Sequence, residues 1–75
     1  MSIKIQGKIE RRDIGMGAWA IISEDGTTYE ILRGADKQLL QAGQTVNVTG
    51  TIRKDVMTTA MIGPVLEVES FEIVE

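Results

Sequence analysis

Residues 19–31, WAIISEDGTTYEI, decide the fold, because they place a turn signal between two segments of β-strand pattern. Glu24-Asp25-Gly26 separates the segments, which is typical of a β-hairpin. A two-residue turn at Asp25-Gly26 would place Ile22 opposite Tyr29. A longer turn with Gly26 in the left-handed region would pair Ser23 with Thr27. We favour the longer turn, because it gathers four large apolar residues on one buried face: Trp19, Ile21, Tyr29 and Ile31.

Alternation of apolar and polar residues continues on both sides of this hairpin. It predicts a long first strand that includes residues 3–10, with Gly7 on the apolar face where a bulge or sharp coil needs it. Further strands are expected at residues 17–23, 27–33, 44–53 and 65–74. In the last strand the apolar phase changes, so we expect a bulge near Ser70.

One short helix is expected within residues 34–43, between the third and fourth strands. Asp36 can cap its start, Leu39 and Leu40 supply an apolar side, and Gly43 can end it. The sequence therefore predicts an all-β domain of five strands with a single helix of one or two turns.

Length and composition indicate one small domain that spans residues 1–75. The chain has neither cysteine nor histidine, so disulfides, thiol nucleophiles and the usual zinc ligands are missing. The absence of cysteine fits a reducing compartment, and we expect a cytoplasmic protein. We expect no signal peptide and no membrane span, because no basic segment precedes an apolar one and no apolar run is long enough.

The order of three strands, a short helix and two strands resembles the five-stranded Greek-key OB barrel, which binds oligonucleotides or oligosaccharides in many proteins. Residues 19–29, 42–50 and 66–70 carry this resemblance, which covers nearly the whole chain. Together they look like small, uncharacterised, single-domain bacterial OB-fold proteins. The resemblance implies a five-stranded barrel whose first and fourth loops flank a binding face. It implies no particular activity, because this fold serves many functions.

Catalysis finds little support in the residues that remain. Glu24 and Asp25 are adjacent, but they belong to a hairpin turn where acidic residues are common. Gly15-Met16-Gly17 lies between two strands and not before a helix, so it is not a phosphate-binding loop. We therefore expect no enzyme, no cofactor and no metal site.

The first and fourth loops combine basic and apolar residues. Each loop follows a basic pair and contains methionine, which suits adaptable binding surfaces. We call the candidate site the rim, and it consists of Arg11, Arg12, Met16, Arg53, Lys54, Met57 and Met61. The rim predicts a protein partner or a second copy of the chain. The competing interpretation is that the basic pairs are solvated strand ends and the methionines cover the end of the barrel.

Weak binding of single-stranded nucleic acid through the same face is the alternative function. Such binding needs a cationic groove with rings for stacking. The chain has 8 basic and 11 acidic residues, and only one Trp, one Tyr and one Phe. The favoured hairpin register buries Trp19 and Tyr29 and leaves Glu30 on the solvent side, where it would repel phosphate. A protein partner is therefore favoured over nucleic acid.

Overall fold

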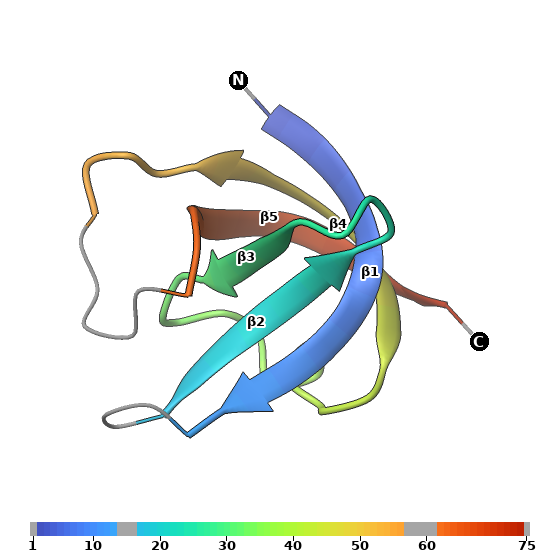
Figure 1. Cartoon of the computed structure of the whole chain (residues 1–75). Coiled ribbons are helices and arrows are strands. Elements are labelled where there is room, and N and C mark those ends of the chain that lie inside the picture. The colour runs from blue at the N-terminus through green and yellow to red at the C-terminus, as the bar shows by residue number, and fades with distance from the viewer. Residues whose placement is uncertain (1, 14–16, 57–61, 75) are drawn as a thin grey trace.

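The chain folds into five strands in a computed structural model that describes residues 2–13, 17–56 and 62–74. The strands are β1 (Ser2–Arg12), β2 (Ala18–Ser23), β3 (Thr28–Ile31), β4 (Thr45–Ile52) and β5 (Val65–Val74). They form a single sheet in the order β1-β2-β3-β5-β4, which closes because β1 also pairs with β4 (Figure 1). The prediction of an all-β chain with five strands is confirmed.

Strand β1 belongs to both halves of the closed sheet and curves strongly around it (Figure 1). Its residues 2–8 pair with β4, and its residues 7–12 pair with β2. Gly7 lies where the two pairings overlap, opposite both Ser23 and Val46. A Cβ atom added to Gly7 would overlap the backbone carbonyl of Ile22, so the predicted need for glycine at this coil is confirmed.

The hairpin between β2 and β3 has the longer turn that the sequence favours. Ile21 pairs with Tyr29, and the Ser23 amide donates to the Thr27 carbonyl at 2.8 Å. Gly26 has a φ of 90°, which is the left-handed conformation that this turn requires. The Thr27 amide also donates to the Asp25 carboxylate at 2.8 Å, which lowers the pKa of Asp25.

Strand β5 contains the expected bulge. Val68 pairs with Gly50 and Ser70 pairs with Thr49, so Glu69 is the extra residue on β5. The bulge explains why the apolar phase changes along this strand. Val68 and Phe71 both pack against the core, although their spacing is odd.

The helix predicted within residues 34–43 is wrong, since this fully described segment consists of turns. Only one hydrogen bond of the α-helical type forms, from the Leu40 amide to the Asp36 carbonyl at 3.3 Å, and the Leu39 amide donates to the same carbonyl at 3.0 Å. The next bond runs from Gln41 back to Leu39, and the Gly43 amide then donates to Ile9 of β1 at 2.8 Å. The segment rejoins β1 after a single turn, so the Gly43 amide bonds to the sheet and does not extend a helix.

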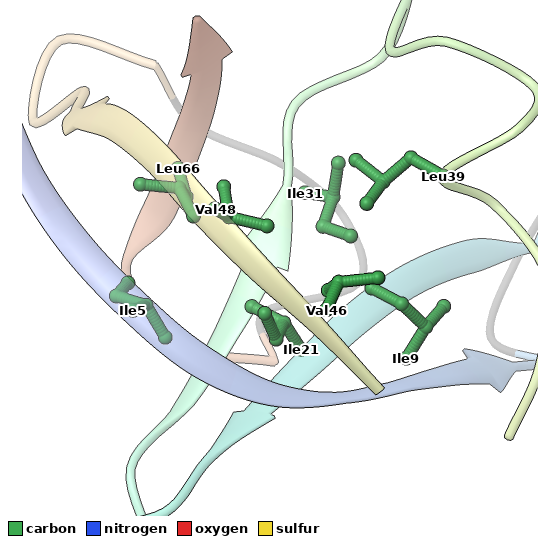
Figure 2. Packing of buried hydrophobic residues seen from close by; sticks show 8 residues of the cluster. All are labelled: Ile5, Ile9, Ile21, Ile31, Leu39, Val46, Val48 and Leu66. Carbon is green, nitrogen blue, oxygen red and sulfur yellow. The ribbon is translucent and has the colours of Figure 1, made fainter. Parts of the chain in front are cut away.

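The core lies inside the closed sheet and receives side chains from every strand and from the turn segment (Figure 2). Its buried members are Ile5, Ile9, Ile21, Ile31, Leu39, Val46, Val48 and Leu66. Trp19 and Tyr29 are half-buried and pack against this cluster. The expectation that they share the inner face of the hairpin with Ile21 and Ile31 is confirmed, although neither ring is fully enclosed.

Candidate binding site

The basic pair at the end of β1 is matched by acidic neighbours. Arg11 is exposed, and its Nε lies 3.4 Å from a carboxylate oxygen of Asp13. The Nε of Arg12 lies 2.7 Å from a carboxylate oxygen of Glu10, but without the alignment of a hydrogen bond. In both contacts the two residues are two positions apart in the sequence, at the end of β1. Each arginine therefore has a carboxylate beside it.

In the basic pair after β4, Arg53 is matched even more closely. The Arg53 guanidinium donates to both oxygens of the Asp55 carboxylate, at 2.9 and 2.7 Å, and to Glu67 of β5 at 3.0 Å. The hydrogen bonds to Arg53 lower the pKa of Asp55 to about 2, and the same contacts raise the pKa of Arg53. Such a bidentate pair is both directional and stronger than a single contact. Lys54 is exposed.

The strand register places the two basic pairs at opposite ends of β1. At one end of β1, Arg12 pairs with Ala18. At the other end, Ser2 pairs with Thr51 of β4, and Arg53 follows two residues later in the chain. In Figure 1, β1 runs from the upper middle of the view, around the right side, to the lower left. Met16, Met57 and Met61 lie outside the described residues, so only the basic members of the rim are placed.

Glu30 does not face solvent, and the expectation that it does is wrong. Its side chain is only 5% exposed, and its cross-strand partner Ala20 is fully buried. Residues 62–64 run beside β3, where the Glu30 amide donates to the Pro64 carbonyl at 2.8 Å. The Ile62 amide approaches the Glu30 carboxylate at 3.5 Å. The chain before β5 therefore covers this carboxylate, and Glu30 is not available to repel a bound phosphate.

Gly63 allows this close cover. A Cβ atom at Gly63 would overlap the carbonyl oxygen of Thr28 on β3. Sequence alternation alone did not reveal this arrangement, because it assigns Glu30 to the outer face and contains no information about a distant segment. The isolated Gly63-Pro64 pair in front of β5 was the only available signal.

A further polar surface, which the sequence did not single out, lies on the outside of β1, β4 and β5. It forms a shallow, open depression of about 640 Å³. Its outward side chains come from cross-strand neighbours of the three strands: Lys4, Gln6, Asn47, Thr49, Ser70 and Glu72. The strict alternation of β1 and β4 was a signal for this surface, because it places every second residue outside.

The described residues contain no group of three or more acidic side chains that would hold a metal ion. No helix in the described part of the chain is long and apolar enough to cross a bilayer.

The chain matches no family model, no curated protein and no solved structure. Function must therefore be argued from its own surfaces.

Proposed function

We propose that this protein is a non-enzymatic binding module with an OB-type barrel, and that it binds a protein partner or a second copy of itself through the rim. The closed strand order, with β1 shared between β2 and β4, supports an OB-type barrel. The absence of cysteine throughout the chain supports a reducing, cytoplasmic setting.

One observation carries the choice of a protein partner: every described arginine of the rim stands beside a carboxylate. Arg11, Arg12 and Arg53 contact Asp13, Glu10 and the Asp55–Glu67 pair respectively. A binder of single-stranded nucleic acid needs uncompensated positive charge to displace counterions from phosphates. Balanced ion pairs instead provide the polar border that surrounds the apolar centre of a protein interface.

The alternative, weak binding of single-stranded nucleic acid, retains some support. Arg11, Arg33 and Lys54 are exposed, and the burial of Glu30 removes one repulsive charge. However, Trp19 and Tyr29 pack against the core, so their rings are not free platforms for bases. We rank this alternative below a protein partner.

The test is a pull-down with the intact chain, combined with sedimentation to detect self-association. Arg11→Glu/Arg12→Glu and Met57→Ser/Met61→Ser should each weaken capture of the partner or of the second copy. Lys37→Glu, an exposed change between β3 and β4, is the control and should have no effect. Capture that both rim variants leave unchanged would refute the rim as the binding surface.

A further inference from the structure

The outer face of β1, β4 and β5 carries a regular array of polar side chains. The strand register aligns them in two rows that cross all three strands. In the first row Lys4 pairs with Thr49 and Thr49 pairs with Ser70. The second row consists of Gln6, Asn47 and Glu72. Lys4 and Glu72 therefore occupy diagonally opposite corners, and four uncharged hydrogen-bonding side chains lie between them. We call this set the polar face.

The polar face differs from its surroundings because its side chains are unused. Across the described part of the chain, none of the six makes a side-chain hydrogen bond or ion pair. The next row along the same sheet is fully engaged. Ser2 and Thr51 both donate to the Glu69 carboxylate, at 3.0 and 2.7 Å, and Arg53 bonds to Glu67. Five of the six residues are exposed and Thr49 is half-buried, so their bonding capacity is directed to solvent.

The chemistry of the polar face limits what it can hold. One positive and one negative side chain balance each other, so a polyanion gains no net attraction. Trp19 and Tyr29 belong to the other half of the sheet. Phe71 lines the depression, but it packs against the core and is not an open platform for a base. Gln6 and Asn47 each offer N–H and C=O groups side by side, which is the same pair that a backbone peptide group presents. The depression of about 640 Å³ falls within the range of ligand sites.

We propose that the polar face binds an extended peptide segment that carries one acidic and one basic side chain. Two strand spacings and one two-residue step separate Lys4 from Glu72, which is roughly 12 Å. Residues i and i+4 of an extended chain lie on the same side and are about 13 Å apart. The acidic residue contacts Lys4, the basic residue contacts Glu72, and the carboxamides bond to the backbone between them. This site does not depend on the rim or on the function proposed for it.

The test uses two synthetic peptides of identical composition, capped at both ends. In the first, Gly-Glu-Ser-Gly-Ser-Lys-Gly, the charges stand at i and i+4. In the second, Gly-Ser-Glu-Lys-Gly-Ser-Gly, they are adjacent. Amide chemical shifts of the intact protein are followed while each peptide is added. We expect the first peptide to perturb the amides of residues 4–6, 47–49 and 70–72, and to bind up to about fivefold more tightly than the second.

Charge reversal makes the test specific. Lys4→Glu should weaken binding of the first peptide by at least about twofold to fivefold and favour a peptide that has lysine at both positions. Glu72→Lys should favour a peptide that has glutamate at both positions. Lys37→Glu and the rim variant Arg11→Glu/Arg12→Glu are controls and should leave peptide binding unchanged, so failure here is separable from failure at the rim. Both corner residues are exposed, and unchanged spectra away from the face verify that the variants fold.

Three results would overturn the proposal. The first is equal binding of the two peptides, because the spacing of charges would then be irrelevant. The second is retention of the original preference by Lys4→Glu. The third is perturbation of the same amides by a neutral oligosaccharide, maltotriose, but not by either peptide, since that would assign the face to a polyhydroxylated ligand.

Discussion

At the scale of single residues, the backbone of the closed sheet depends on positions where no side chain fits. Gly7 allows β1 to pass close to β2, and Gly50 opposes the backbone of Glu67 on β5 in the same way. Both residues lie on the inner face of curved strands, where the group nearest to an added Cβ atom would be a backbone carbonyl. Their role is therefore steric and does not depend on a positive φ.

We predict that Gly7→Ala destabilises the fold, because the new methyl group would overlap the Ile22 carbonyl. Overpacking of this kind costs about 1–3 kcal/mol, and each kcal/mol lowers Tm by roughly 4–8 °C in a domain of this size. Thermal unfolding followed by circular dichroism measures the change. Lys8→Ala, at the exposed neighbouring position, is the control and should shift Tm by little. An unchanged Tm for Gly7→Ala would show that the strands separate at no cost.

A second prediction at this scale concerns acid stability. The pKa of Asp55 is lowered to about 2 in the folded chain, from an ordinary value of 3.8, because Arg53 donates two hydrogen bonds to it. Since the folded pKa is the lower one, this contribution to stability is present above pH 3.8 and is lost as the pH falls towards 2. Urea midpoints should therefore fall across this window.

The matching variant is Asp55→Asn, which cannot be ionised. Its urea midpoint should depend less on pH between about 4 and 2 than the midpoint of the natural chain. The pKa of Glu69 is also lowered, by hydrogen bonds from Thr51 and Ser2, so part of the dependence should remain. An identical pH profile for the variant and the natural chain would contradict the role of Asp55.

At the scale of elements, the segment between β3 and β4 acts as a plug and not as a helix. Leu39 is fully buried in the core (Figure 2). Leu40 is half-buried and packs against the border of the core. Bonds from the Gln44 side-chain amide to the carbonyls of Gln38 and Leu39 hold the turn together. The element keeps one apolar anchor inside the closed sheet and leaves the rest of its side chains near the surface.

Leu39→Ala should therefore cost about 2–5 kcal/mol, because it removes a fully buried side chain from a core that has few members. Denaturant unfolding measures this loss, which is a large fraction of the stability of so small a domain. Leu40→Ala is the matched comparison, and it should cost clearly less because Leu40 is partly exposed. Equal losses at both positions would mean that Leu39 is not the anchor of the segment.

At the scale of the whole molecule, the distribution of charge matters more than its total. The net charge is −3, and the described arginines of the rim stand beside carboxylates. In the described part of the chain, these ion pairs leave less uncompensated positive charge for a phosphate backbone to contact. The same balance is compatible with contacts between two folded proteins, in which charges direct orientation more than affinity.

We predict weak or absent binding of single-stranded DNA and RNA at physiological salt. Fluorescence anisotropy with a labelled oligonucleotide measures it at two salt concentrations, because phosphate contacts release counterions and weaken steeply as salt rises. Lys54→Glu, which removes an exposed positive charge of the rim, should change the result little. Submicromolar binding that decreases with salt would reverse the ranking of the two functions.

The sequence by itself determined the local elements of this protein. Alternation located all five strands, the Glu24-Asp25-Gly26 signal selected the register in which Ile21 meets Tyr29, and the phase change near Ser70 predicted the bulge. Each of these depends on residues close together in the chain. Side-chain period and turn chemistry are local properties, so they can be inferred without knowledge of the fold.

Only the tertiary structure decided which surfaces are covered and which charges are paired. Glu30 is buried because residues 62–64 lie beside it, and Arg53 is held by Glu67, fourteen residues away on another strand. The helix expected near Leu39 is replaced by a turn, since Gly43 bonds to Ile9 of β1. The polar face likewise needs the register of three strands. These features depend on contacts between distant segments, and one strand's pattern does not specify which other segment packs against it.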